Sequence, residues 1–182
     1  GNVYCQYRGQ GGVKLGSGLR RLAWAWKLGD FKALISQYLR PKSRVMFRRQ
    51  IMDRLEEIAP FLRYDSDPYL VIDNGKLYFI VSAYTTSSYY PYAEWHKSGI
   101  NYIRDAVKVV VDTYNGWVNF YVVDNADIII RTWRKVFPTL FKSIAEMPTG
   151  LRRHIRYGED MFKIQAEMYG VYHMTDPEVF YN

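Results

Sequence analysis

Two Asn-Gly dipeptides, each placed between apolar runs, constrain the fold of this chain more than any other feature. They are Asn74-Gly75 and Asn115-Gly116. A two-residue type I′ turn needs positive φ at both central positions, and Asn-Gly adopts this conformation readily. Each dipeptide therefore predicts a β-hairpin. Together they predict a four-stranded antiparallel sheet within residues 64–123.

The side chains around both turns alternate in the manner of half-buried strands. In the first hairpin, residues 69–73 lead to the turn, and the apolar side chains after it are Leu77, Phe79, Val81 and Ala83. In the second hairpin, one face carries Val107, Val109 and Val111, and the return strand carries Val118, Phe120 and Val122. Successive side chains of a strand point to opposite faces, so this pattern predicts one buried face. Residues 85–101, rich in Thr, Ser, Tyr and Pro, predict a long loop.

Helical patterns precede the predicted sheet. The first helix carries apolar residues at helical spacing, namely Leu19, Leu22, Ala23 and Trp26, and ends at Gly29. A short second helix is predicted from Asp30 to Tyr38. A third is capped by Ser43 and carries an apolar stripe as far as Leu62, which indicates an amphipathic helix packed on a core. The glycine-rich stretch 1–18 predicts a loop or docking arm.

Helical patterns also follow the sheet. Asp124 or Asn125 is predicted to cap a helix whose stripe runs to Leu140 and which bends or restarts at Pro138. A final helix is predicted at about 159–169, with a turn at 173–177. The sequence thus predicts one α+β domain over 1–182, made of a basic helical segment (1–63), two hairpins (64–123) and a helical segment (124–182). The sheet is expected to be flanked by helices from the N-terminal and C-terminal segments.

The positive charge of the chain is concentrated near its N-terminus. The net charge is +7, yet residues 1–63 hold 13 Lys and Arg against 4 Asp and Glu, whereas the remainder is slightly acidic. A basic segment of this kind fits anionic lipid head groups or nucleic acid. Solvated basic faces on ordinary helices explain it equally simply, and we favour that interpretation.

No apolar run approaches the roughly 20 residues that a membrane-spanning helix needs. The first residues, Gly1-Asn2-Val3, include neither an initiator Met nor a signal-peptide pattern. We therefore expect a soluble piece of a larger protein.

The sequence carries no recognisable catalytic, metal or nucleotide motif. His96, His154 and His173 lie far apart without a partner at metal-ligand spacing, so neither a metal nor another cofactor is predicted. The Asp65-x-Asp67 turn lacks the further oxygen ligands of a Ca²⁺ loop and predicts an Asx turn. The hydroxyl groups after Tyr84 lack a nucleophile motif. We expect the chain not to be an enzyme.

Two segments are candidate binding surfaces. The loop at 84–92 contributes Tyr84, Thr85, Thr86, Ser87 and Tyr92, and the basic cluster contributes Arg152, His154, Arg156 and Tyr157. Aromatic loop residues can bind carbohydrate or a protein partner, and a basic cluster can hold an anion. Packing of the aromatic rings over the sheet edge, and solvation of the basic turn, are the alternatives.

Ordered strings along the chain resemble a known family. They are Tyr7-Arg8-Gly9, Ala59-Pro60-Phe61-Leu62, Asp67-Pro68-Tyr69, Ala83-Tyr84-Thr85-Thr86-Ser87, Asn101-Tyr102-Ile103-Arg104, Val111-Asp112-Thr113-Tyr114-Asn115-Gly116, Phe137-Pro138-Thr139-Leu140-Phe141, His154-Ile155-Arg156-Tyr157 and Tyr172-His173-Met174. Together, and in this order, they resemble Uncharacterised Protein Family 0182, a set of large bacterial multi-pass membrane proteins. The resemblance covers essentially the whole chain.

This resemblance implies a parent in the cell membrane and places this segment in its soluble, extracytoplasmic region. It implies no activity. It also predicts residues that differ from those found: Asp where Ser82 stands, Asn where Asp105 stands and Pro where Gly158 stands.

We therefore expect a non-catalytic domain for protein or envelope interaction. The expected partners are the membrane-spanning part of the same protein, an envelope protein or an anionic lipid surface, with no nucleic acid. A ligand-sensing or substrate-presenting domain is the alternative.

Overall fold

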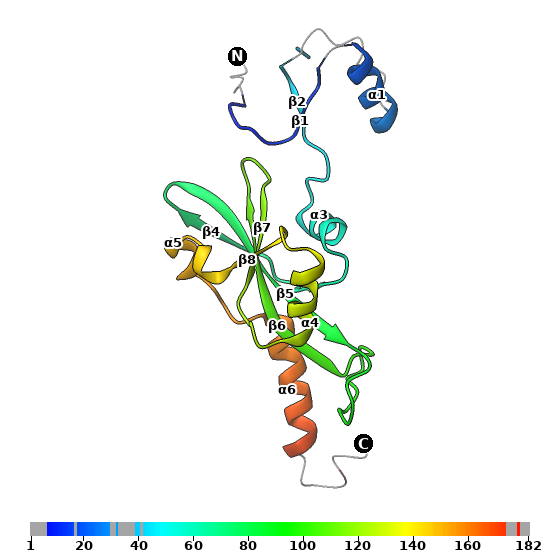
Figure 1. The fold of residues 1–182 in the computed structure, drawn as a ribbon, viewed down its shortest axis with the longest axis vertical. Coiled ribbons are helices and arrows are strands. Elements are labelled where there is room, and N and C mark those ends of the chain that lie inside the picture. The colour runs from blue at the N-terminus through cyan, green and yellow to red at the C-terminus, as the bar shows by residue number, and fades with distance from the viewer. Residues whose placement is uncertain are drawn as a thin grey trace.

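The computed structural model describes residues 7–16, 18–29, 32, 39–40, 42–173 and 178, and has the predicted α+β class (Figure 1). The elements in chain order are β1 (Val13–Lys14), α1 (Gly18–Leu28), β2 (Arg44–Val45), α3 (Ile51–Ile58), β3 (Arg63–Tyr64), β4 (Tyr69–Asp73), β5 (Lys76–Ser87), β6 (Tyr102–Asp112), β7 (Val118–Val122), α4 (Ile128–Val136), β8 (Phe141–Ser143), the 3₁₀ helix η1 (Ile144–Glu146), α5 (Thr149–Arg152) and α6 (Glu159–His173).

The molecule is elongated. Figure 1 shows the small β1–β2 sheet and α1 at one end, the main sheet in the middle, and α6 extending from it toward the other end. Residues 7–12, here called the glycine-rich arm, contact the main sheet at the turn between β6 and β7. The backbone N–H of Gln10 donates to Asn115 Oδ1 at 2.8 Å, and a Cβ on Gly11 would lie 2.1 Å from the Asn115 carbonyl oxygen. Glycine at position 11 thus permits the close approach of the arm to the turn between β6 and β7.

Within the described residues, the main sheet has six strands, so the prediction of four was wrong. Its order is β3-β5-β6-β7-β8, and β4 also pairs with β5. The four strands of the two hairpins pair antiparallel, and β8 adds to β7 in parallel. The two additional strands, β3 and β8, are two and three residues long. Strands this short carry no readable alternation, which is why the sequence pattern missed them.

The two Asn-Gly turns differ. Asn74 and Gly75 have φ of 50° and 72° and lie between the paired residues Asp73 and Lys76, as a two-residue turn requires. The second turn is longer. The Gly116 N–H donates to the Asp112 carbonyl oxygen at 2.7 Å, and of Asn115 and Gly116 only Gly116 has positive φ. The Asp112 carboxylate caps this turn by accepting the backbone N–H groups of Tyr114 and Asn115.

Both faces of the central strands are buried, whereas the sequence predicted one buried face. One core contains Val81, Val109 and Phe120 from the sheet and is covered by Leu55 of α3 and Ile130 of α4. The core on the opposite face is made of Val71, Ile80, Val110, Tyr121, Met147 and Leu151. Figure 1 shows α3 and α4 on one side of the sheet and α5 on the other. Strands covered on both faces carry continuous apolar runs, and Val107 to Val111 is interrupted only by Lys108.

A β-bulge on β6 changes which face its first half presents. Ala83 pairs with Val107, but the next residue of β5, Tyr84, pairs with Asp105, so Ala106 is the extra residue. Without the bulge, Asp105 would share the face of Val107 and Val109. The bulge turns the Asp105 side chain to the opposite face, where Lys108 also lies.

Several predicted element boundaries were wrong. The helix predicted from Ser43 begins only at Ile51, because Arg44 and Val45 pair with β1 and Gln50 provides the N-cap. The helix ends at Ile58, since Ala59 precedes Pro60 and has non-helical backbone angles, φ −138° and ψ 73°. The loop predicted at 85–101 begins after β5 ends at Ser87.

The C-terminal helices also differ in their bounds. Asp127, rather than Asp124 or Asn125, caps α4, and this helix ends at Val136, before Pro138. The last helix, α6, extends to His173. The helix predicted at 30–38 and the turn predicted at 173–177 lie outside the described residues except for residues 32 and 173.

Candidate functional site

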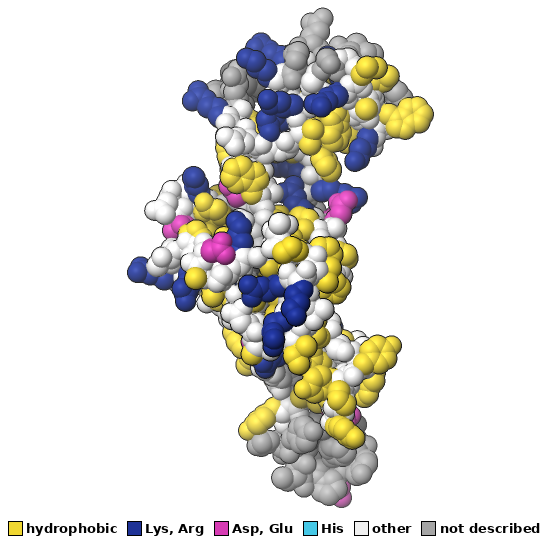
Figure 2. Space-filling model, viewed as in Figure 1, with side chains coloured by type: hydrophobic (Ala, Val, Ile, Leu, Met, Phe, Trp, Pro, Cys, Tyr) yellow, Lys and Arg dark blue, Asp and Glu magenta, His cyan; other side chains and the backbone are white. Residues whose placement is uncertain are grey.

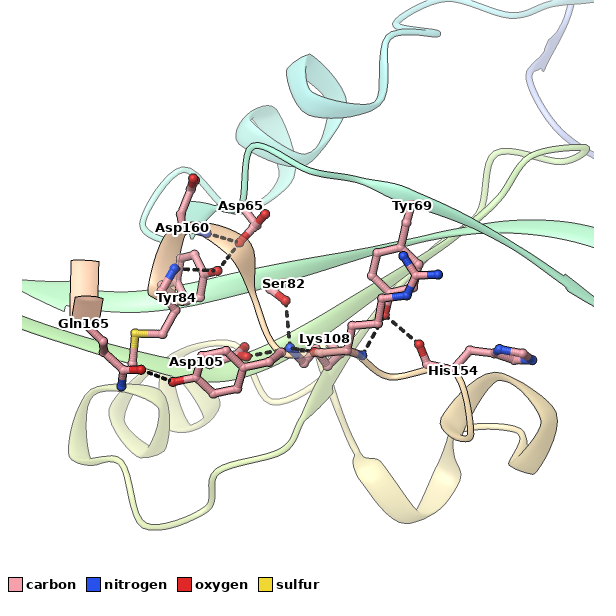
Figure 3. A network of polar contacts seen from close by, with 12 residues as sticks. Asp65, Tyr69, Ser82, Tyr84, Asp105, Lys108, His154, Asp160 and Gln165 are labelled. Atoms are coloured by element: carbon pink, nitrogen blue, oxygen red, sulfur yellow. Dashed lines mark hydrogen bonds and ion pairs between the residues drawn. The ribbon is translucent and has the colours of Figure 1, made fainter. Parts of the chain in front are cut away.

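A buried lysine lies among polar groups on one face of the sheet. Lys108 of β6 is 3% exposed. Its ammonium group donates to Ser82 Oγ at 2.7 Å, Asp105 Oδ2 at 2.6 Å and the Arg156 carbonyl oxygen at 2.9 Å (Figure 3). An ammonium group has three N–H donors, and here each has an acceptor. Lys108 therefore joins β5, β6 and the segment that crosses over them.

Asp105 supplies the negative charge beside Lys108. Burial raises the pKa of the Asp105 carboxyl group above its ordinary value, and the hydrogen bond from Lys108 opposes that rise. Its second oxygen, Oδ1, is buried and has no hydrogen-bond partner among the described residues. Among the described residues, Lys108 is the ion-pair partner of Asp105, so removal of either group leaves the other buried without its partner.

A second buried carboxylate lies on the same face, next to the first. Asp65 Oδ2 accepts hydrogen bonds from Tyr84 Oη and from the Asp160 backbone N–H, the latter at 3.0 Å. Asp65 Oδ1 accepts the Asp67 N–H at 2.9 Å, which is the predicted Asx turn. Burial, followed by the bond to Asp65, raises the pKa of the Tyr84 hydroxyl group. This carboxylate connects the first turn of α6 to the sheet.

Residues 153–158, here called the covering segment, pass over these groups. Tyr69 of β4 holds the segment by donating to the His154 carbonyl oxygen at 2.9 Å and accepting the Arg156 N–H at 3.1 Å. The Arg156 guanidinium group lies 4.5 Å from the centre of the Tyr69 ring. A Cβ on Gly158 would lie 2.0 Å from Tyr84 Oη, so the absence of a side chain allows this close approach. We call Asp65, Ser82, Tyr84, Asp105 and Lys108 the polar cluster.

The chemistry available to the polar cluster is limited by its burial and its bonding. A serine beside a lysine can form a nucleophile and base, provided that the amine is neutral and the hydroxyl group can reach a substrate. Ser82 and Lys108 are both only 3% exposed, and all three Lys108 donors are engaged. In this arrangement the ammonium group fixes the covering segment on the sheet.

The candidate residues of the 84–92 segment are divided between different surroundings. Tyr84 belongs to the polar cluster, whereas Thr85 lies on the opposite face and donates to Asp127 Oδ2 at 2.7 Å, within the N-cap of α4. Thr86 and Ser87 complete β5. Tyr92 is fully exposed and has a φ of 59°.

The candidate residues of the basic cluster lie over the polar cluster or beside it. Arg156 and His154 contact Lys108 and Tyr69 through their backbone carbonyl groups. The Tyr157 hydroxyl group donates to Gln165 of α6 at 2.6 Å. The Arg152 side chain, at the end of α5, is exposed. The structure therefore brings the covering segment against Tyr84 through Gly158 but does not join the loop and the basic cluster into one surface.

Sequence reasoning missed the residues at the centre of the cluster, Ser82, Asp105 and Lys108. One signal was present, since Lys108 is a lone charge within the run Val107 to Val111. A charge in a strand buried on both faces needs a partner, so this lysine predicts a buried acceptor. The partner Asp105 could not be found from strand alternation, because the bulge at Ala106 reverses its face.

Two open grooves flank the turn between β6 and β7. One, of about 510 Å³, lies between the glycine-rich arm and the face of Tyr121, and its aromatic lining is Tyr78, Tyr114, Trp117 and Tyr121. The other, of about 680 Å³, is lined by residues that include Phe47, Arg54 and Trp117. Neither groove is lined by residues of the polar cluster. Within the described part of the chain, no three or more His, Cys, Asp or Glu side chains are grouped to hold a metal ion, and no helix could span a membrane.

The sequence pattern of an uncharacterised protein family, UPF0182, matches residues 1–182. The chain belongs to this family. A UPF0182 protein of Pelotomaculum thermopropionicum is 52% identical over 181 residues, and one of Microcystis aeruginosa is 54% identical over 187 residues. Both comparisons cover 100% of this chain but 20% of the relative, so the chain spans about a fifth of those proteins. No solved structure matches.

The three departures from the residues that the UPF0182 resemblance predicts all lie at the polar cluster. Ser82 and Asp105 stand where Asp and Asn are predicted, and both contact the Lys108 ammonium group. Gly158, in place of the predicted Pro, lies against Tyr84. Relative to that prediction, the carboxylate beside Lys108 stands at position 105 and not at position 82.

Proposed function

We propose that this chain is a non-catalytic interaction domain on the extracytoplasmic side of a larger bacterial membrane protein. The observation that carries this proposal is an ordered loop that presents aromatic side chains to solvent. The loop comprises residues 88–101 between β5 and β6, and we call it the aromatic loop. Tyr89, Tyr92 and Trp95 are its most exposed large side chains.

Hydrogen bonds across the aromatic loop fix its shape. The Tyr90 N–H donates to Asn101 Oδ1 at 3.0 Å, and Asn101 Nδ2 donates back to the Tyr90 carbonyl oxygen at 2.8 Å. The Tyr90 ring stacks on Tyr102 with ring centres 4.9 Å apart. On the far side, His96 Nε2 lies 2.9 Å from Glu167 Oε2 of α6. The exposed rings therefore stand on a loop whose neighbouring residues are anchored. Because the loop is already ordered, it loses little conformational entropy on binding.

Exposed aromatic residues on an ordered loop fit a protein partner. Tyr and Trp offer large contact areas with few rotatable bonds and dominate the binding energy of many interfaces. Because this chain spans 20% of the length of the UPF0182 relatives, most of such a protein lies outside it. We infer that the partner is another part of the same membrane protein or a neighbouring envelope protein, without nucleic acid or a cofactor.

Photo-cross-linking in the full-length membrane protein tests this proposal. A photoreactive residue would replace Tyr92, and in a second variant Ile128 of α4, which is also well exposed, as the matched control. We expect one defined cross-linked product from position 92 and none from position 128. Equal, diffuse labelling from both positions would overturn the proposal.

The 510 Å³ groove supports the alternative of a ligand-sensing domain. Its four aromatic side chains and the Arg8–Gln10 arm could hold a small ligand with a flat or apolar face. A ligand of this groove would raise the melting temperature of the protein. The increase would be lost in Trp117→Ser and retained in Trp95→Ser, whose side chain lies in the aromatic loop. Retention in both variants would exclude the groove.

A further inference from the structure

Helix α1 exposes an apolar stripe to solvent. Leu22 and Trp26 follow Leu19 by three and seven positions, which places the three side chains along one side of the helix. Leu19 and Trp26 are 84% and 80% exposed. The other side of α1 is packed, because Ala25 is fully buried and the Trp24 ring lies 5.3 Å from the Phe47 ring. The contacts of Trp24 and Ala25 therefore fix the helix with Leu19, Leu22 and Trp26 facing outward.

The surroundings of α1 are strongly basic. Residues 1–50 contain 11 Lys and Arg but one Asp, whereas residues 51–182 contain 14 Lys and Arg against 17 Asp and Glu. We call β1, α1 and β2 the N-terminal platform. Its exposed charges include Lys14 on β1, and Arg20 and Lys27 on α1. Figure 2 shows hydrophobic and basic side chains next to one another at this end of the molecule.

We propose that the N-terminal platform docks on an anionic lipid surface, with the α1 stripe in the head-group layer. A bilayer that contains acidic lipids complements both features, since its head groups attract Lys and Arg while its interface accepts Leu and Trp side chains. Each Lys or Arg close to such a surface strengthens binding roughly fivefold. This surface is distinct from the aromatic loop, so the inference stands or falls separately from the proposed function.

Other partners match only half of these features. A nucleic acid would engage the positive charges through its phosphates but would leave the stripe of Leu19, Leu22 and Trp26 without a role. A second copy of the chain could cover the stripe, but it would bring two strongly basic segments together. An anionic bilayer is the partner that uses the stripe and the charge together.

Vesicle co-sedimentation of the 182-residue chain tests the proposal. The probes are vesicles of phosphatidylcholine alone and vesicles that also contain phosphatidylglycerol. We expect binding only to the second kind, and weaker binding as salt is added, because salt screens the attraction. Tryptophan fluorescence should shift to shorter wavelength on binding.

Matched variants separate the stripe from the charges. Leu19→Ser with Trp26→Ser should weaken binding by about tenfold or more, since both side chains then stay out of the interface. Ile128→Ser with Phe162→Ser, which alters exposed apolar residues of α4 and α6, should leave binding unchanged. Lys14→Glu with Arg20→Glu should abolish the preference for phosphatidylglycerol, and Lys142→Glu with Arg153→Glu should preserve it. The altered side chains are exposed, so circular dichroism should report folded protein throughout.

Four results would overturn the proposal. They are equal binding to both kinds of vesicle, no binding to either, binding that is indifferent to Leu19 and Trp26, or a dimer in light scattering that Trp26→Ser dissociates. The third result combined with salt-sensitive binding to duplex DNA would assign the platform to nucleic acid instead.

Discussion

At the scale of single residues, the polar cluster shows how a glycine can be required by its neighbour. Gly158→Ala places a methyl group 2.0 Å from Tyr84 Oη, and Tyr84 is held by Asp65. We expect Gly158→Ala to lower the free energy of unfolding by about 1–3 kcal/mol. Gly170→Ala is the matched control, because its Cβ meets nothing within 4 Å. In α6 this change should stabilise by roughly 0.5–1 kcal/mol. Urea unfolding of both variants checks the prediction, and equal effects would contradict it.

The two side-chain partners of Lys108, Ser82 and Asp105, allow a test of where its counter-charge can reside. Asp105→Asn leaves the ammonium group without an anion, and Ser82→Asp places a second carboxylate beside the first. We expect each single variant to lose about 1–3 kcal/mol of unfolding free energy. The double variant restores one carboxylate at the other position, so it should lose less than the sum by about 1 kcal/mol or more. Denaturant titration of the four proteins measures this coupling, and strict additivity would refute a shared ammonium group.

At the scale of elements, α6 is connected to the aromatic loop by a pair of contacts that depend on pH. His96, followed by Lys97, lowers the pKa of the Glu167 carboxyl group below its ordinary 4.5. A lowered folded-state pKa means that these contacts stabilise the folded state at pH values above 4.5 and are lost as the pH falls through the lower folded-state pKa. We therefore expect the aromatic loop to separate from α6 in acid before the sheet unfolds.

The NMR signal of the Trp95 indole N–H, followed from neutral pH to below pH 4.5, reports this separation. Glu167→Gln removes the titrating carboxylate. In this variant the chemical shift of the Trp95 indole N–H should keep its low-pH value at every pH. A Trp95 signal that moves with pH equally in Glu167→Gln would mean that another group controls the loop.

Elements were predictable from sequence where one local rule determined them. Asn74-Gly75 gave its hairpin because the turn chemistry and the flanking strands agree. The helix predicted from Ser43 started too early, because the stripe through Phe47 and Ile51 continues the helical pattern while Arg44 and Val45 pair with a distant strand. Long-range pairing of this kind overrides local preference and leaves no local signal.

The polar cluster was harder to predict from the sequence than the fold was. Lys108 could be recognised as a charge that needs a partner, but the partner depends on a bulge and on a segment nearly 50 residues later, at Arg156. Thr85 shows that residues adjacent in sequence can also lie in different sites. It follows Tyr84 directly and was grouped with it, yet the alternation of β5 directs the two side chains to opposite faces.

At the scale of the whole molecule, the two proposed contact surfaces lie at opposite ends. Figure 1 shows the N-terminal platform at one end of the long axis and the aromatic loop toward the other, near α6. The main sheet and its polar cluster lie between them. A domain of this shape could contact a bilayer at one end and a protein at the other, with the sheet setting the distance between the two.

We propose a division of roles in this protein, in which buried polar groups hold the fold and exposed aromatic groups face partners. Urea unfolding of Lys108→Met and of Tyr92→Ser with Trp95→Ser, measured side by side at neutral pH, tests it most directly. Lys108→Met leaves Asp105 buried without its ammonium partner and should lose about 3–5 kcal/mol. The free energy of unfolding of the aromatic-loop variant should stay within roughly 0.5 kcal/mol of that of the unaltered chain. An unchanged free energy of unfolding in Lys108→Met, or an equal loss in the aromatic-loop variant, would contradict this division of roles.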